Sequence, residues 1–245
     1  MKLTEFDALS FDCYGTLIDW EAGLRSELAK IASVVPDSPE IDALLETYGA
    51  CEAEAERVVP GLRYPEIVAR SAVAAGAIHG IAVPDGLAAE IGASVPNWPA
   101  FPDSAEALAR LQRHFRLIIL SNVDRASFAG SNERLGVTFD AIVTAEDIGS
   151  YKPNRRNFEA LLETTGELGI APGRLLHVAQ SLFHDHVPAQ AAGLPTVWID
   201  RRHAQGGFGA TPPPPMEVEP TWTFASMAAF ADAVDEAATE AGDQA

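Results

Sequence analysis

The hydrophobic positions along the chain fall into two kinds of segment. Short apolar runs bounded by turn residues are typical of buried strands in a parallel sheet. The chain has five such runs, at residues 8–11, 115–120, 141–144, 175–179 and 195–199. Segments with helical spacing alternate with the later runs, at about residues 103–114, 154–165, 186–192 and 227–238. This alternation predicts an α/β fold with a doubly wound parallel sheet.

An all-helical insert separates the first apolar run from the second. Its four segments show helical spacing or a helix-favouring composition, at about residues 20–35, 41–59, 64–79 and 84–95. Proline-containing breaks or turns separate these segments, and three prolines within residues 96–102 form a stiff hinge candidate at the end of the insert. We therefore expect one unit built from residues 1–17 and 97–245 and a helical unit built from residues 18–96. Residues 201–220, rich in glycine and proline, are expected to form a loop.

Asp12 comes directly after the first apolar run, and Gly15 follows it closely. Ligands of open α/β sheets bind beyond the carboxyl ends of the strands. A carboxylate at that place can attack an electrophile and form a covalent ester. The alternative is that Asp12 only stabilises a turn, because Asp is common before Gly in turns.

Four short motifs follow one another along the chain. They are Asp-Cys-Tyr-Gly-Thr at 12–16, Leu-Ser-Asn at 120–122, Tyr-Lys-Pro at 151–153, and the run 177–185 leading into Gly-Leu-Pro-Thr at 193–196. In this order they resemble the motifs of the haloacid dehalogenase superfamily, and the first resembles its (S)-2-haloacid dehalogenase (type II) branch. The resemblance covers about residues 6–200. It implies a Rossmann-like core, a small all-helical cap inserted after the first strand, and hydrolase activity.

Tyr14 separates the chemistries within that superfamily. Phosphatases of the superfamily carry a second aspartate at this position, as acid and base for the leaving oxygen. A phenol, with a pKa of about 10, is a poor proton donor at neutral pH. A halide needs no proton when it leaves, so the resemblance favours attack on carbon.

The resemblance implies a two-step route with Asp12 as the nucleophile. Asp12 displaces halide from C2 of a small carboxylic acid, and water then cleaves the resulting aspartyl ester. Lys152 keeps Asp12 ionised, and Thr16 orients its carboxylate. Asp185 activates the water as a general base. The residues expected to contact the substrate are Tyr14, Ser121, Asn122, Gln180, Ser181 and His184.

Two departures from the branch concern the substrate. Its usual Ser-Ser-Asn before the second aspartate is here Gln180, Ser181 and Leu182. The arginine that the branch places in its cap is missing near Thr47, so an arginine from another helical turn would have to replace it. The candidates are Arg57, Arg63 and Arg70.

The formal net charge of −18 changes the range of partners. It argues against nucleic acid and anionic membranes, which need clustered Lys and Arg. An anionic substrate would be repelled at long range, so the site needs a local cation, for which Lys152 is the candidate. The N-terminus has no apolar signal segment, no run is long enough to span a membrane, and the two cysteines suit a reducing compartment, so we expect a cytoplasmic protein.

We expect no metal and no cofactor. The run 184–186, His-Asp-His, would point its side chains in different directions on a helix, and only one acid besides Asp12 is expected nearby. A homodimer is possible by resemblance. Three other functions stay open: ring opening of a cyclic amino acid such as azetidine-2-carboxylate, phosphatase activity, and binding without turnover.

Overall fold

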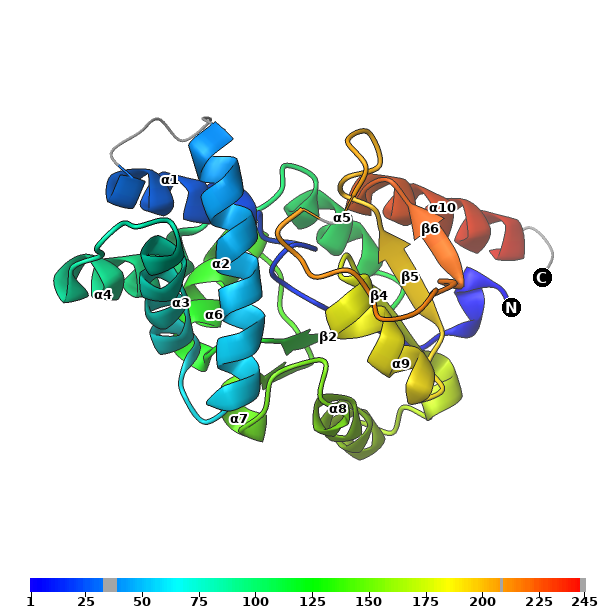
Figure 1. Cartoon of the computed structure of the whole chain (residues 1–245). Coiled ribbons are helices and arrows are strands. Elements are labelled where there is room, and N and C mark those ends of the chain that lie inside the picture. Colours follow the sequence, from blue (N-terminus) through cyan, green and yellow to red (C-terminus); the bar gives the residue numbers. More distant parts are fainter. Residues whose placement is uncertain (33–38, 208, 243–245) are drawn as a thin grey trace.

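The computed structural model describes residues 1–32, 39–207 and 209–242. Within these residues six strands form one parallel sheet in the order β3-β2-β1-β4-β5-β6 (Figure 1). The predicted α/β fold with a doubly wound sheet is confirmed. The strands are β1 (Ala8–Phe11), β2 (Arg116–Ser121), β3 (Ala141–Thr144), β4 (Leu175–Ala179), β5 (Thr196–Ile199) and β6 (Trp222–Phe224).

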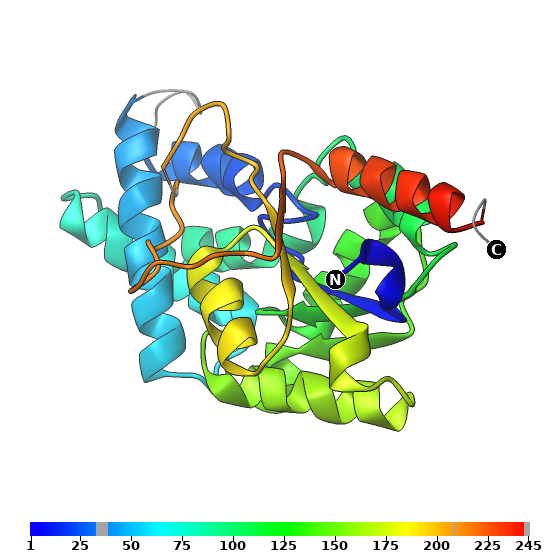
Figure 2. The same ribbon diagram turned by 90° about the vertical axis from the view of Figure 1, so that its right-hand side faces the viewer.

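Hydrophobic side chains on both faces hold the sheet between two layers of helices. On β2, Leu117 and Ile119 join one buried cluster, whereas Ile118 and Leu120 join another. This division follows from the alternation of side chains along a strand. Figure 2 shows α10 and α8 on opposite sides of the sheet. The helices of this part are α5 (Ser104–Leu111), α6 (Arg125–Leu135), α7 (Ala145–Ile148), α8 (Arg155–Glu167), α9 (Val187–Ala191) and α10 (Met227–Gly242).

The insert that follows β1 is helical, as predicted, and its helices gather to one side of the sheet (Figure 1). We call the helices α1 to α4 the cap; whether core and cap divide at the predicted boundaries stays a prediction. The expected continuation of the first helix to residue 35 and the break that follows lie largely outside the described residues. The cap helices are α1 (Trp20–Ala32), α2 (Pro39–Val58), α3 (Tyr64–Ile78) and α4 (Asp85–Ala93).

Short helical turns complete the described chain: η1 (Leu3–Glu5), η2 (Val95–Asn97), η3 (Pro172–Arg174) and η4 (Leu182–His186). The last is a π-helical turn that leads directly into α9. None of the described helices is long and apolar enough to cross a membrane.

The loop before β6 lies against the cap. The backbone N–H of Ala210 donates to Glu21 Oε1 in α1 at 3.1 Å, and Arg202 pairs with the same carboxylate. Gly49 in α2 makes the approach possible, because a side chain there would overlap the Ala210 carbonyl oxygen.

Replacing Gly49 with Ala should therefore destabilise the protein, although Ala is normally the better helix former. We expect Gly49→Ala to lower the free energy of unfolding by about 1–3 kcal/mol through overpacking. The matched control is Gly166→Ala near the end of α8, where a new Cβ meets nothing within 4 Å. That variant should gain up to about 1 kcal/mol. Urea unfolding of both variants checks the contrast, and equal shifts would contradict the close approach.

Candidate active site

The carboxyl ends of β1 and β4 meet at the centre of the sheet. The chain runs from β1 outward to β2 and β3, and then returns to the other side of β1 with β4. Open α/β sheets bind ligands at such a reversal of strand order. Asp12 follows β1 at this point, and Asp185 lies in the turn η4 that follows β4.

The Lys152 ammonium lies between these two carboxylates. Its Nζ is 2.9 Å from Asp12 Oδ1 and 2.7 Å from Asp185 Oδ1. It also donates to the carbonyl oxygen of Leu120 at 3.1 Å. Lys152 is only 2% exposed, and these three contacts satisfy all three donors of its buried ammonium.

Thr16 holds the other oxygen of the Asp12 carboxylate. Its hydroxyl donates to Asp12 Oδ2 at 2.6 Å and accepts the backbone N–H of Gln180 at 2.9 Å. Gly15 adopts a φ of +96° in the turn between the two residues, a conformation that favours glycine. The turn thus fixes the direction in which Asp12 presents its carboxylate.

Burial and the central lysine act against each other on the acidity of this cluster. Burial raises the pKa of Asp12 above the ordinary 3.8, and the Lys152 charge opposes the rise. Burial also acts to raise the pKa of Asp185, but the Lys152 charge and a hydrogen bond from His177 outweigh it and hold that pKa well below the usual range. The two carboxylates in turn raise the pKa of Lys152 despite its burial.

His177 is a member of this cluster that the sequence analysis did not single out. Its Nε2 lies 3.0 Å from Asp185 Oδ1, and its Nδ1 lies 2.9 Å from the hydroxyl of Ser10. An ionised carboxylate only accepts, so Nε2 donates to Asp185. Ser10 and His177 are register partners on β1 and β4. Two polar residues within otherwise apolar strands were the signal that could have indicated this pair.

Asn122 clamps the backbone of Lys152. Its Oδ1 accepts the Lys152 N–H at 2.6 Å, and its Nδ2 donates to the Lys152 carbonyl at 3.1 Å. The same Nδ2 is 3.2 Å and 3.1 Å from the two carboxylate oxygens of Glu56. The side-chain amide that was expected to contact substrate therefore also links the cap to the lysine.

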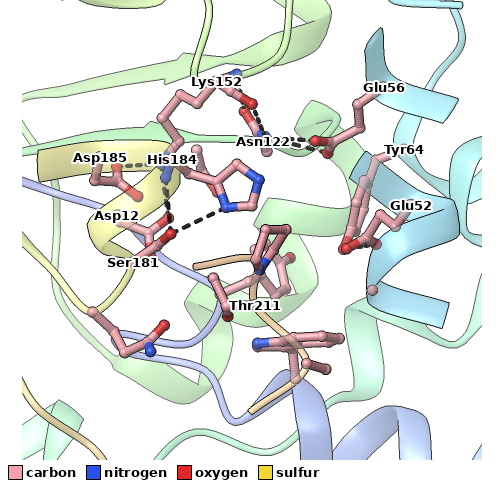
Figure 3. A pocket seen from close by; sticks show the side chains of 17 residues that line it. Asp12, Glu52, Glu56, Tyr64, Asn122, Lys152, Ser181, His184, Asp185 and Thr211 are labelled. Carbon is pink, nitrogen blue, oxygen red and sulfur yellow. Dashed lines mark hydrogen bonds and ion pairs between the residues drawn. The ribbon is translucent and has the colours of Figure 1, made fainter. Parts of the chain in front are cut away.

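A small cavity of about 50 Å³ lies between the carboxyl ends of the central strands and the cap (Figure 3). All six residues expected to contact the substrate line it, as do Asp12, Lys152 and Asp185, whereas Thr16 lies outside the lining. The remaining lining residues are Trp20, Gly49, Glu52, Glu56, Tyr64, Ala210, Thr211 and Pro212.

Three buried polar atoms among the lining residues have no hydrogen-bond partner within the described protein: Ser121 Oγ, His184 Nε2 and Asp185 Oδ2. Ser181 Oγ accepts the His184 N–H at 2.9 Å and lies 3.1 Å from its Nδ1. Burial lowers the pKa of His184 to about 4, so the ring is neutral at pH 7. When Ser181 donates to Nδ1, the Nε2–H of His184 is a donor for a ligand.

The cap side of the cavity carries carboxylates, and the expected replacement of the cap arginine is wrong for this cavity. None of the three candidate arginines lines it. Arg57 pairs with Glu54 and lines an adjoining cavity of about 490 Å³, and Arg63 pairs with Asp124 and Glu146. Arg70 is exposed. Glu52 and Glu56 stand on this wall instead.

The fold and the site define an α/β enzyme whose reactive groups gather at the switch point of a parallel sheet. The chain belongs to the haloacid dehalogenase-like hydrolase family, which matches residues 6–193. The predicted membership of this superfamily, and with it the prediction of a hydrolase, is confirmed.

Two curated relatives carry different activities. The (S)-2-haloacid dehalogenase H-109 of Pseudomonas putida is 28% identical over 226 residues, covering 84% of this chain and 91% of the relative. The pyrimidine 5'-nucleotidase YjjG of Escherichia coli (strain K12) is 28% identical over 128 residues. That match spans only about half of each protein, 51% of this chain and 52% of the nucleotidase.

Solved dehalogenase structures share the fold. The L-2-haloacid dehalogenase of Xanthobacter autotrophicus with chloropropionic acid covalently bound superimposes with a TM-score of 0.73 at 17% identity. The match covers 94% of this chain and 98% of that one. The resemblance to the dehalogenase branch is thus supported by a relative in sequence, and the structural neighbours show the shared fold.

Proposed function

We propose that the protein hydrolyses a carbon–leaving group bond at C2 of a small carboxylic acid, most simply as a 2-haloacid dehalogenase. The observation that carries this proposal is the buried contact between the Lys152 ammonium and Asp12 at the cavity. Supporting it, the hydroxyl of Tyr14 is bonded to Ser131 Oγ at 2.9 Å, and burial raises its pKa well above 10. Tyr14 thus stands where the phosphatases of the superfamily carry the aspartate that protonates the leaving oxygen.

In the first step an oxygen of Asp12 attacks C2 of the acid. The new C–O bond forms as the carbon–halogen bond breaks, and the halide leaves with the bonding electron pair. Lys152 and Thr16 each hold one carboxylate oxygen, so the nucleophile needs little reorientation. We assign the substrate carboxylate to the neutral donors Ser121 and His184, because Ser121 Oγ and His184 Nε2 have no partner in the described protein.

In the second step water cleaves the aspartyl ester at the Asp12 carbonyl. The water oxygen adds to the Asp12 carbonyl carbon. The bond between that carbon and the substrate oxygen breaks, and a 2-hydroxy acid is released. Asp185 Oδ2, without a partner in the described protein, accepts a hydrogen bond from this water. The low pKa of Asp185 makes it a weak base, so its role is to orient the water. The complete reaction releases one proton per turnover to the solvent.

Activity should fall as the pH is lowered into the acid range. The nucleophile must be ionised, and burial raises the pKa of Asp12 above 3.8, so the fall should begin at a higher pH than for an ordinary aspartate. The measurement is kcat/KM for 2-chloropropionate against pH, with circular dichroism at each point to exclude unfolding. A profile that stays flat below the ordinary aspartate pKa would contradict a buried nucleophile.

A substrate panel tests the proposal itself. We expect halide release from (S)-2-chloropropionate and, on acid-quenched enzyme, a mass increase that maps to the peptide containing Asp12. Because one relative is a nucleotidase, the panel includes p-nitrophenyl phosphate with Mg²⁺. Phosphate release without halide release or an ester on Asp12 would overturn the proposal in favour of a phosphatase.

A further inference from the structure

Two carboxylates of α2 face the reactive groups across the cavity. Glu52 and Glu56 are one helical turn apart, and Figure 3 shows them on the side opposite Asp12 and Asp185. Glu56 is 6% exposed. Tyr48 and Tyr64 both donate to Glu52 Oε1, at 2.9 Å and 3.0 Å.

The balance of charge in the cavity favours a cation. Among the lining residues that the structure describes, Lys152 alone carries a permanent positive charge, and it is bound to both core aspartates. Four carboxylates line the same space: Asp12, Glu52, Glu56 and Asp185. A purely anionic ligand would be repelled by the cap wall, whereas a positive group beside that wall would reduce the repulsion between the carboxylates.

An independent observation shows that the cavity is built for a polar ligand. Ser121 is 2% exposed and lines the cavity, yet its hydroxyl has no partner in the described protein. A buried polar atom in this position is costly unless a ligand or water satisfies it. Ser121 stands at the end of β2 and can bind a carboxylate while the cap wall binds the other end of the molecule.

We propose that Glu52 and Glu56 form a subsite for a protonated amine, so that the substrates of this enzyme are small amino-group-bearing acids. This inference rests on the proposed function and specifies its substrate class. Core donors hold the substrate carboxylate near Asp12, and the cap holds the ammonium. On this account the cap needs no arginine, because the substrate carboxylate is bound by the core and the cap faces the ammonium instead.

The acidity of the cap wall gives the subsite a measurable signature. Burial raises the pKa of Glu52 to about 7, against the hydrogen bonds from Tyr48 and Tyr64. Burial also raises the pKa of Glu56 well above 4.5, and the nearby Glu52 adds to the rise whereas Lys152 and Asn122 oppose it. A bound ammonium favours the ionised form, so binding should release protons and tighten as the pH rises through 7. A bound anion should take up protons and bind more weakly over the same range.

Inert ligands test the subsite without requiring any chemistry at Asp12. β-Alanine, with its amine on C3 and its C2 free for a leaving group, differs from propionate by the amine alone, and ethylammonium lacks the carboxylate. By titration calorimetry of the full chain, we expect β-alanine to bind about tenfold or more tightly than propionate. Glu52→Gln should remove that preference, while Glu54→Gln, an exposed residue of the same helix, should keep it. Titrations in buffers of different ionisation enthalpy count the protons released.

The outcomes separate this inference from the proposed function. Propionate binding as tightly as β-alanine, proton uptake instead of release, or no β-alanine binding at millimolar concentration would each overturn the subsite, even where 2-chloropropionate is turned over. A preference for β-alanine that depends on Glu52 would support the subsite, even where no ester on Asp12 is found and the proposed function fails.

Discussion

Asp12→Asn should abolish turnover while leaving the fold intact. The amide keeps the shape of the carboxylate but cannot supply the ionised oxygen that bonds to carbon. Loss of an enzyme's nucleophile typically costs a factor of about 10³ or far more in kcat. We expect halide release from 2-chloropropionate to fall at least that far, and the ester on the peptide containing residue 12 to vanish from the mass spectrum.

The control is the same substitution at the opposite end of the same strand. Asp7 precedes β1, is exposed, and pairs with Arg174 Nη2 at 2.6 Å, away from the cavity. Asp7→Asn should retain nearly full activity. If Asp12→Asn released halide at the normal rate, Asp12 would not be the nucleophile, and the proposed route would be wrong.

Lys152→Met should produce the second largest effect, on both stability and activity. It removes the cation that lies between two buried carboxylates, and breaking a buried pair costs about 3–5 kcal/mol. The carboxylates would respond with raised pKa values and take up a proton, which disarms Asp12 at neutral pH. We expect halide release to fall by a factor of about 10³, measured beside urea unfolding.

The pH dependence of stability distinguishes this cause from a simple packing defect. In Lys152→Met the carboxylate pKa values are higher in the folded than in the unfolded state, so stability is fully present at low pH and is lost as the pH rises through the folded-state pKa. The deficit relative to the native protein should therefore shrink in acid. Lys30→Met removes an exposed lysine paired with Glu27 and should change little. A deficit independent of pH would refute the electrostatic account.

The predicted strands are the four interior strands β1, β2, β4 and β5 and the edge strand β3. β1, β2 and β4 are buried on both faces and read as continuous apolar runs, so their places were predictable to within about two residues. β6 was missed, because this edge strand has only three residues and none is fully buried. α6 was also missed, since its apolar spacing is weak. Asp124 caps its start and Gly136 its end, and these local signals could have indicated it.

The site divides in a similar way between what motifs reveal and what only packing reveals. Lys152 lies 140 positions after Asp12 and 33 positions before Asp185, yet the motif order indicated that the three residues meet, and the Lys152 ammonium contacts both carboxylates. The cap wall could not be foreseen, because a glutamate in a helix rich in Ala and Glu looks like a solvated residue. Only the packing of α2 over the cavity shows that Glu52 and Glu56 turn inward.

The hydrogen bond between Asn122 and Glu56 couples the position of the cap to the protonation of the Glu56 carboxyl group. It joins α2 to the sheet, so it exists only while the two are in contact. Withdrawal of α2 would hydrate Glu56 and return its pKa towards the ordinary 4.5. Opening would therefore favour ionised Glu56 and closing would favour protonated Glu56, so a lower pH should favour the closed cap and a higher pH the open one.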